Sequence, residues 1–421
     1  MPQKMSIQGW LTWLSLSLFS LLQFFLQVSG NMLVHPMMRT FHLNEAGLGA
    51  FNSSFFYGYV VVQILAGLLF DRYHLRRVCL IAITTLALGS LGFALSENLS
   101  LALVARFIMG AGSGFAFVGM VFSASEYFPT RQFAMMVGIG EFIAMAGTAA
   151  AQKFAPYLIM SQGWQLLMLI CAATATVLFL MMLLCIHEPT PQPKTSTLWQ
   201  ELRNNVTEII KIKSVWLSGL FCMASFGVIT GFAALWGVPF LQNTHGFNYL
   251  QATSAMSLVL LGIAIGGPII GWFGGKPARL QRGLRLTAIG LLLSTILVLV
   301  LPKMHMLLYP ALFIMGVFGS SYVLSFSAVK LNTPLALRGT GIGLCNTIAL
   351  LGALIFQPVG GAVMTALKHS HLSASHIDAL ALLILPIVML LALIGNYFIH
   401  CKTPEFTQAR ESVETTTTQA A

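Results

Sequence analysis

The sequence predicts an all-α membrane protein of twelve transmembrane helices, arranged as two related halves of six helices each. Three observations carry this prediction: an apolar composition, a series of apolar stretches long enough to cross a bilayer, and an internal repeat. Hydrophobic residues make up 57% of the 421 positions and charged residues only 8%, against roughly 25% charged in an ordinary soluble domain. Water therefore cannot be the main solvent of this chain.

Apolar stretches follow one another along almost the whole sequence. A transmembrane helix needs about 20 mostly apolar residues, and little of the chain remains for a soluble domain. The stretches lie near residues 10–34, 46–70, 77–96, 98–125, 132–155, 164–186, 215–241, 249–274, 284–302, 306–329, 339–365 and 377–400.

The first stretch has a second interpretation as a cleaved signal peptide, because Val28, Ser29 and Gly30 loosely resemble a cleavage site. Its length, the presence of Gln23 and Gln27 within it, and the need for an even number of crossings favour a membrane span.

The net charge of +10 would suit a nucleic acid partner, but the basic residues follow the membrane topology. With the N-terminus in the cytoplasm, the other side of the membrane receives only Arg39, Lys153, Lys303 and Lys368, and Arg106 falls within a span. Such a bias is the positive-inside pattern. It predicts that both termini lie in the cytoplasm and that the protein surface contacts a lipid bilayer and no nucleic acid. The expected location is the bacterial inner (plasma) membrane.

The longest polar interruption divides the chain into two halves of six spans. It contains Pro189, Pro191 and Pro193 and then a short amphipathic stretch around residues 199–212. The predicted units are an N-terminal bundle at 1–187, a cytoplasmic linker at 188–214, a C-terminal bundle at 215–401 and a cytoplasmic tail at 402–421.

The two halves repeat one another at an offset near 204 residues. Four matches occur in the same order, and the parallel topology relates the halves by an axis along the membrane normal, as in many carriers. The matches pair residues 107–110 with 313–316, 122–124 with 326–328, Pro129 with Pro334, and 138–140 with 341–343.

The loop after the second span carries a motif built from Gly67, Asp71, Arg72, Arg76 and Arg77. It resembles the signature of the major facilitator superfamily (MFS) of secondary transporters, Gly-x-x-x-Asp-Arg-x-Gly followed by basic residues. The sequence departs from it at His74, where glycine is usual, and a degenerate copy follows the eighth span at residues 271–276. The resemblance implies the MFS fold and a gate at this loop.

In that family this loop latches the cytoplasmic gate. Asp71 is then expected to accept hydrogen bonds from the amino end of the eleventh helix, which starts near Arg338. Glu126 is expected to pair with Arg72 or Arg76. The alternative is that these basic residues only fix the topology.

Two ionisable residues lie within spans, where charge is costly and usually functional. Arg106 precedes closely spaced small residues in a pattern that resembles the superfamily's fourth helix, where the arginine is often linked to coupling or to an anionic substrate group. Glu141 follows Arg131 by ten residues, or ~15 Å along a helix, near the midplane. It is a candidate proton carrier. An arginine that reaches the interface and a protonated glutamate that bonds a neighbouring helix are the structural alternatives.

Polar and aromatic side chains with helical spacing complete the predicted substrate site. The first helix carries a stripe of three amides, and we expect the N-terminal half to hold the polar part of the substrate while aromatic surface of the C-terminal half closes over it. Amide bonding between helices is the alternative for any single member. The candidates are Gln23, Gln27, Asn31, Asn52, Tyr59, Gln63, Trp236, Tyr322 and Asn346, with Tyr57, Ser325 and Gln357 beside them.

The six cysteines include no close pair and no CxxC, so neither a disulfide framework nor a zinc site is predicted. His369, His371 and His376 cluster in the last outer loop, where a solvated loop is favoured over a metal site. No cofactor, no metal and no catalytic residue is expected.

The predicted function is secondary active transport of a small polar solute by alternating access, with proton-coupled uptake of an organic anion, peptide or similar metabolite favoured. The chain has no ATP-binding motif of the GxxxxGK[ST] type, which argues against a pump. A drug or metabolite exporter is an alternative, although residues 140–147 lack the Gly-Pro pair typical of those antiporters. The other alternative is a transporter-like sensor that binds a ligand without transporting it. An enzyme is not expected. The carrier is expected to act as a monomer.

Overall fold

The computed structural model describes residues 7–128, 130–186, 203, 206–274, 277–301, 304–334, 337–368 and 370–397. These residues form helices, with no strand among the elements of the described part. The all-α prediction is confirmed. Apolar side chains fill the interior and also cover much of the outside, where Leu184, Trp272 and Val300 are each more than two-thirds exposed. Such a surface suits hydrocarbon and not water.

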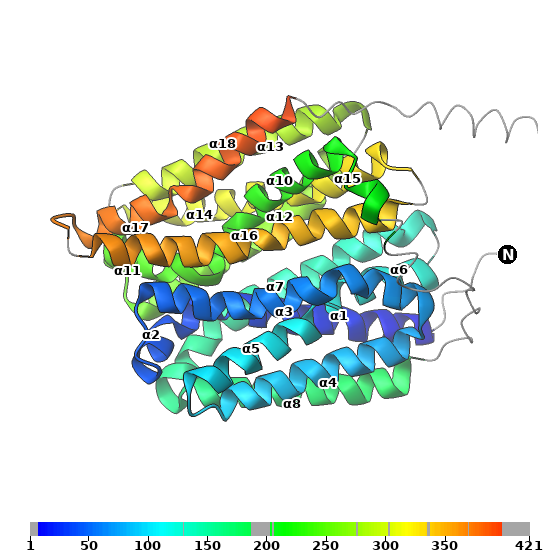
Figure 1. Cartoon of the computed structure of the whole chain (residues 1–421), viewed down its shortest axis with the longest axis horizontal. Coiled ribbons are helices and arrows are strands. Elements are labelled where there is room, and N and C mark those ends of the chain that lie inside the picture. Colours follow the sequence, from blue (N-terminus) through cyan, green and yellow to red (C-terminus); the bar gives the residue numbers. More distant parts are fainter. Residues whose placement is uncertain are drawn as a thin grey trace, which may run out of the picture.

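The helices divide into two groups that lie side by side (Figure 1). The N-terminal half contains α1 (Ile7–Val28), α2 (Gly30–Thr40), α3 (Glu45–Arg72), α4 (Leu75–Ala94), α5 (Leu99–Ser113), α6 (Ala116–Tyr127), α7 (Thr130–Gln162) and α8 (Trp164–Cys185). The C-terminal half contains α10 (Lys213–Gly227), the π-helix η1 (Val228–Trp236), α11 (Gly237–His245), α12 (Tyr249–Gly274), α13 (Pro277–Val300), α14 (His305–Gly319), α15 (Tyr322–Asn332), α16 (Arg338–Leu367), α17 (Ala374–Leu382) and α18 (Ile384–Asn396).

The helices are long and apolar enough for twelve crossings. Eleven helical segments of the described part meet the length and composition of a membrane span. The twelfth is α3, whose 28 residues extend ~42 Å at 1.5 Å per residue, more than the ~30 Å hydrocarbon thickness. Predicted and observed bounds differ by up to seven residues: the sixth span was expected at 164–186 and is Trp164–Cys185, whereas the fifth was expected to end at 155 and ends at Gln162.

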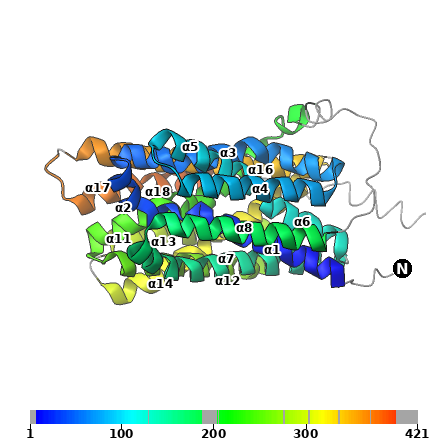
Figure 2. The same cartoon turned by 90° about the horizontal axis from the view of Figure 1, so that it is seen from below.

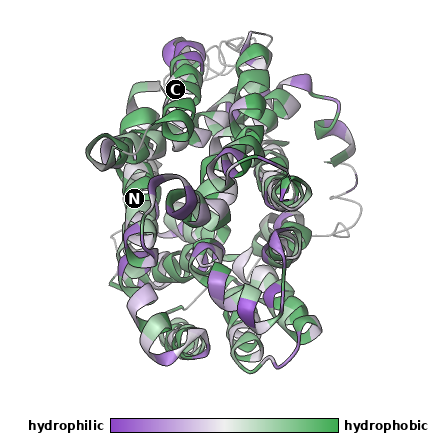
Figure 3. Ribbon diagram, turned by 90° about the vertical axis from the view of Figure 1, so that its left-hand side faces the viewer, coloured by the Kyte–Doolittle hydropathy of each residue, from purple (hydrophilic) through white to green (hydrophobic). Residues whose placement is uncertain are grey.

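The helix axes run roughly along one direction, as two perpendicular views of the bundle make clear (Figures 1 and 2). The chain begins α1 at one end of the bundle, and α18 runs toward that same end (Figure 1), as an even number of crossings requires. We call this the inner end and the opposite one the outer end, following the predicted orientation. In the view along the bundle, apolar residues cover most of the helical ribbon (Figure 3).

Several crossings are interrupted, including the first and the seventh. The first crossing is interrupted at Ser29, between α1 and α2, and the seventh contains η1. All nine residues of η1 are buried. A π-helix is rare and is often found at functional sites, and the apolar pattern of residues 215–241 did not predict it.

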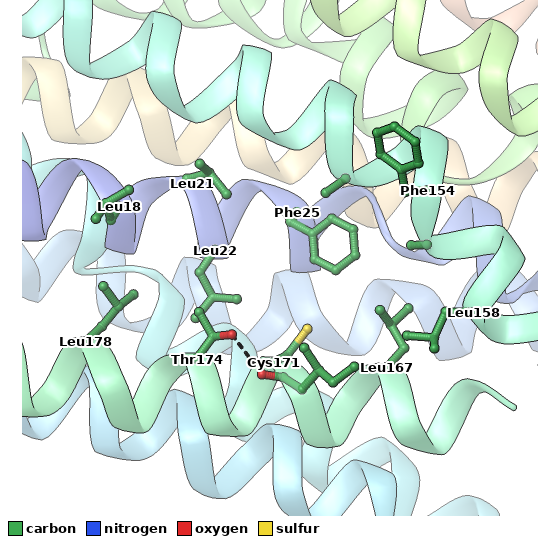
Figure 4. A pocket seen from close by; sticks show the side chains of 13 residues that line it. Leu18, Leu21, Leu22, Phe25, Phe154, Leu158, Leu167, Cys171, Thr174 and Leu178 are labelled. Atoms are coloured by element: carbon green, nitrogen blue, oxygen red, sulfur yellow. Dashed lines mark hydrogen bonds between the residues drawn. The ribbon is translucent and has the colours of Figure 1, made fainter. Parts of the chain in front are cut away.

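An apolar crevice of about 450 Å³ opens between α1, α7 and α8. Leu18, Leu22 and Phe25 of α1 face Leu178 and Leu167 of α8 across it (Figure 4). Its walls are almost wholly hydrocarbon, and Phe154 at its edge is 66% exposed. This face of α1 therefore looks toward the membrane.

Candidate functional site

Arg106 on α5 is the most enclosed charged side chain of the described part. It is 0% exposed, and its Cζ lies 5.3, 5.8 and 5.6 Å from the ring centres of Phe51, Phe55 and Phe93. Aromatic faces attract a cation at such distances. Its Nη2 donates to Asn52 Oδ1 at 2.6 Å, whereas Nε and Nη1 have no hydrogen-bond partner among the described residues.

Close backbone packing brings Arg106 and Asn52 together. A Cβ added to Gly110 of α5 would lie 1.8 Å from the Phe55 carbonyl oxygen, and one added to Gly58 of α3 would lie 1.9 Å from that of Phe107. Only glycine permits this approach, as is common between membrane helices.

Asn52 also links Arg106 to the C-terminal half. Its Nδ2 donates to Gln357 Oε1 of α16 at 2.9 Å, and Gln357 Nε2 donates to the Thr230 carbonyl of η1 at 2.7 Å. The Trp236 indole nitrogen donates to the Gln357 carbonyl at 3.1 Å. The predicted residues Arg106, Asn52, Trp236 and Gln357 thus form one buried chain of hydrogen bonds across both halves.

Further contacts close the outer end. Lys368 Nζ lies 3.1 Å from Glu45 Oε1, and the Ala46 amide donates to Thr365 Oγ1 at 3.1 Å. The Tyr249 hydroxyl donates to the Met32 carbonyl at 2.7 Å. Each contact joins one half to the other, so the described conformation is sealed on that side.

Glu141 on α7 meets Tyr322 on α15. The Tyr322 hydroxyl donates to Glu141 Oε1, which joins the two halves by a second polar contact. Tyr322 is buried and packs edge-on against Phe226, with ring centres 5.2 Å apart, whereas Glu141 is half-buried. The sequence indicated both residues but not that they bond each other.

The amide stripe of the first crossing is buried. Gln23 Nε2 donates to Gln27 Oε1 at 2.5 Å, and Asn31 Nδ2 donates to the Ala233 carbonyl of η1 at 2.5 Å. Gln23 Oε1, Gln27 Nε2 and Asn31 Oδ1 have no partner among the described residues. The three amides are thus buried within the protein, and Asn31 belongs to α2; their predicted role in substrate binding stays a prediction.

The remaining candidates are more dispersed. Tyr59 is buried and packs on Phe55 at 6.3 Å between ring centres. Gln63 is buried with its Oε1 unpaired in the described part, and Asn346 is half-buried. These three are not joined to the Arg106 or Glu141 clusters by a hydrogen bond between described groups.

The gate motif is described only in part. The side chains of Asp71, Arg72 and Arg338 lie outside the described residues, as does Lys276 of the degenerate copy, although α16 begins at Arg338 as expected. Arg76 Nη2 donates to the Leu183 carbonyl at the end of α8, at 2.6 Å. The remaining members lie as follows: Gly67 is on α3, Arg77 is exposed, and Glu126 is exposed on α6. The latch itself stays a prediction.

One buried polar residue was not among those predicted from the sequence. Gln152 of α7 is fully buried with neither amide atom paired in the described part. It follows Glu141 by eleven residues, three helical turns, and that spacing on one face was the available signal. Of the three histidines of the last outer loop, His369 lies outside the described residues, and no group of three metal-ligating side chains occurs among the described ones.

Comparison with known proteins identifies the family. The family model described as Major Facilitator Superfamily matches residues 13–357. The cis,cis-muconate transport protein of Acinetobacter baylyi is 22% identical over 84% of this chain and 89% of its own. The gallate transporter of Pseudomonas putida is 23% identical over 78% and 80%. The gentisate transporter of Corynebacterium glutamicum is 22% identical over 78% and 75%.

Solved structures share the fold. A bacterial homolog of the human lysosomal transporter Spinster, in an inward-facing and unoccupied conformation, superposes with a TM-score of 0.72 at 16% identity, covering 94% of this chain and 98% of that one. A D-xylose–proton symporter gives a TM-score of 0.72 at 16% identity, covering 94% and 99%.

Proposed function

The chain belongs to the Major Facilitator Superfamily of membrane transporters, and we propose that it takes up a small organic anion, driven by protons, through alternating access. Arg106 is the proposed anion-binding group and Glu141 the proposed proton carrier. The proposal also places both termini in the cytoplasm and the protein in the plasma membrane, with one chain sufficient for transport.

The anion assignment rests on the surroundings of the buried Arg106 guanidinium. A buried guanidinium is costly unless it is paired, and here its described partners are one neutral amide and three aromatic faces. Its Nε and Nη1 have no partner among the described residues, and Nη2 has a second N–H beside the one bonded to Asn52, so either unpaired nitrogen can form a fork with Nη2. A carboxylate fits a guanidinium in two-pronged geometry, so an organic acid is the ligand class that best completes this site.

The relatives favour the same class. The three bacterial relatives with coverage of at least three-quarters are described as transporters of muconate, gallate and gentisate, and each of these substrates is an organic carboxylate. The match to a drug efflux pump of Mycobacterium tuberculosis spans only 40% of this chain, which gives the exporter alternative less support.

Proton coupling is assigned to Glu141 because of its bond to the opposite half. A carboxylate that accepts from Tyr322 must give up that bond, or exchange it, when the halves separate. Protonation removes the charge that strengthens the bond. Loading and release of a proton at Glu141 thus affects how firmly the halves are joined, which is what a coupled carrier requires.

Uptake by proteoliposomes tests the proposal. The purified protein is reconstituted and offered muconate, gallate, benzoate, a neutral sugar and a cationic dye, with and without an inward proton gradient. We expect concentrative uptake of at least one acid only with the gradient. Uptake of the sugar or export of the dye alone would contradict the anion assignment, and equal uptake without the gradient would contradict proton coupling.

A further inference from the structure

Three buried glutamines face the interior with hydrogen-bonding groups left over. Gln152 of α7 is 0% exposed, and neither its Oε1 nor its Nε2 has a partner among the described residues. The bond from Gln23 to Gln27 uses one atom of each amide and leaves Gln23 Oε1 and Gln27 Nε2 unpaired. Buried polar atoms are nearly always hydrogen-bonded in folded proteins, so these groups indicate a ligand or enclosed water.

The main chain adds another acceptor at the same place. Pro156 lies inside α7 and has no N–H to donate to the carbonyl of Gln152, four residues earlier. The same situation occurs at Met32, whose helical donor is replaced by Pro36, and there the Tyr249 hydroxyl of the opposite half donates to the carbonyl. Gln152 therefore presents a donor and two acceptors in one turn of helix.

The register of α1 and α7 brings the three glutamines to one level. Thr148 Oγ1 donates to the Leu21 carbonyl at 3.4 Å, and the two helices run in the same direction. Gln152 follows Thr148 by four residues, which places it ~6 Å nearer the outer end than the contact. Gln27 follows Leu21 by six residues, which places it ~9 Å nearer that end. Gln23 lies between the contact and Gln27.

The glutamine side chains also point toward the interior, away from the membrane-facing crevice. Leu18, Leu22 and Phe25 of α1 line the membrane-facing crevice (Figure 4), and at about 100° per residue Gln23 and Gln27 lie on the opposite face of that helix. On α7, Gln152 shares its direction with Glu141, to within ~20° after eleven residues, and Glu141 reaches the C-terminal half.

Arg106 lies close to this group through Asn52. A Cβ added to Gly30 would be 2.2 Å from Asn52 Oδ1, the atom that accepts from Arg106. Gly30 follows Gln27 by three residues, ~4.5 Å along the helix. Along the helix, the residue that contacts Asn52 is thus ~4.5 Å from Gln27 and ~10.5 Å from Gln23, a span that a small aromatic or dienoic acid can bridge.

We propose that Gln152, Gln23 and Gln27 bind hydroxyl or carbonyl groups of the transported acid, at the end remote from the carboxylate held by Arg106. The inference rests on the proposed anion transport. A neutral amide has both hydrogen-bond donors and an acceptor. It can therefore bond a hydroxyl group, but it forms no hydrogen bond with an unsubstituted ring edge. In the described conformation the outer end is closed, and the site opens to its ligand when the halves separate.

Paired substrates test the inference. Initial uptake of 3,4,5-trihydroxybenzoate and of benzoate is measured in proteoliposomes for the unmodified protein and for Gln152→Met, which keeps the side-chain length and removes the amide. We expect KM for trihydroxybenzoate to rise by about tenfold or more, with KM for benzoate changed less than about twofold, because a site that bonds hydroxyls discriminates strongly against analogues without them. Gln23→Met serves as a second variant should the first fold poorly.

The control is Thr148→Val, which removes a buried polar group of the same helix that already has its partner. It should leave the ratio of the two KM values unchanged. Equal changes for both acids in the glutamine variants would mean that the amides hold structural water, and would overturn the inference alone. Uptake of neither acid by the unmodified protein would overturn the anion proposal together with it.

Discussion

Arg106 and Glu141, the two charged residues that the sequence predicts within spans, lie in contrasting surroundings. Arg106 is sealed by three phenylalanine rings and tied through Asn52 and Gln357 to the far half, whereas Glu141 is half-buried and bonded to a single tyrosine. A group held from several sides keeps its position and suits recognition. A group with one exchangeable bond can change its protonation state without dismantling its surroundings. The difference supports a fixed anion-binding group and a movable proton carrier.

The largest effect is expected at Glu141. Glu141→Gln keeps the size and can still bond Tyr322 but cannot exchange a proton at neutral pH. Accumulation driven by a proton gradient should be abolished, while exchange of internal for external substrate continues, since that step needs no net proton movement. Glu97→Gln, an exposed acid changed in the same way, should behave as the unmodified protein. Unaltered gradient-driven uptake in Glu141→Gln would remove it from the coupling step.

Arg106 should show the opposite pattern. Arg106→Gln removes the cation and keeps a donor for Asn52, so both exchange and gradient-driven uptake should weaken through KM. Losing one partner of a buried charged pair costs ~2–5 kcal/mol, or roughly 30- to 5,000-fold. The measurement is KM for an acid substrate, with Arg39→Gln, an exposed cation near the outer end, as control. A fall in maximal rate at constant KM would point to a structural arginine instead.

The effect of loosening the outer end can be tested at a close glycine contact between α16 and α3. A Cβ at Gly361 of α16 would lie 2.3 Å from the Glu45 carbonyl oxygen, so Gly361→Ala should push α16 from α3 and loosen the Asn52–Gln357 link. A cysteine at Ser53, in a background free of other reactive cysteines, should then react several-fold faster with a membrane-impermeant maleimide. Gly343→Ala, on the same helix with open space around it, is the matched control. An unchanged labelling rate would show that the contact does not limit opening.

The smallest effect is expected at the Lys368–Glu45 ion pair. The Lys368 side chain is 58% exposed, and exposed pairs contribute ~0.2–1 kcal/mol and weaken with salt. Lys368→Met should raise the same labelling rate by less than about fivefold at low salt, with the difference shrinking at high salt. A large effect that salt does not reduce would mean that the pair is a principal part of the outer seal.

The sequence predicted the fold well because hydrocarbon length and the repeat constrain it locally. The charged residues Arg106 and Glu141 were also found, since a charge inside an apolar stretch stands out. Their partners were harder to foresee. The pairing of Glu141 with Tyr322, or of Asn52 with Gln357, joins residues 181 and 305 positions apart and depends on which conformation the halves adopt.

Other parts of the site gave a weaker signal. Gln152 is a single amide on a long helix, and its importance emerges only from its complete burial and the lack of partners in the described part. The π-helix η1 has an ordinary apolar composition, so hydropathy cannot distinguish it from an α-helical turn. The side chain of Asp71 lies outside the described residues, and Asp71→Asn, which removes the gate charge without a packing change, would test its predicted role.

The irregular turns of the first and seventh crossings occupy equivalent places in the repeated sequence. An offset near 204 residues carries the break at Ser29 to about Ala233, inside η1, and Asn31 donates to the carbonyl of Ala233 itself. The irregular turns of the two halves thus lie at matching positions of the repeat and touch each other. Water is scarce at that depth, so a carbonyl that loses its donor finds no easy substitute. A rearrangement at either irregular turn that breaks this hydrogen bond therefore leaves a polar group unpaired in the other half, so the contact couples the two halves at this point.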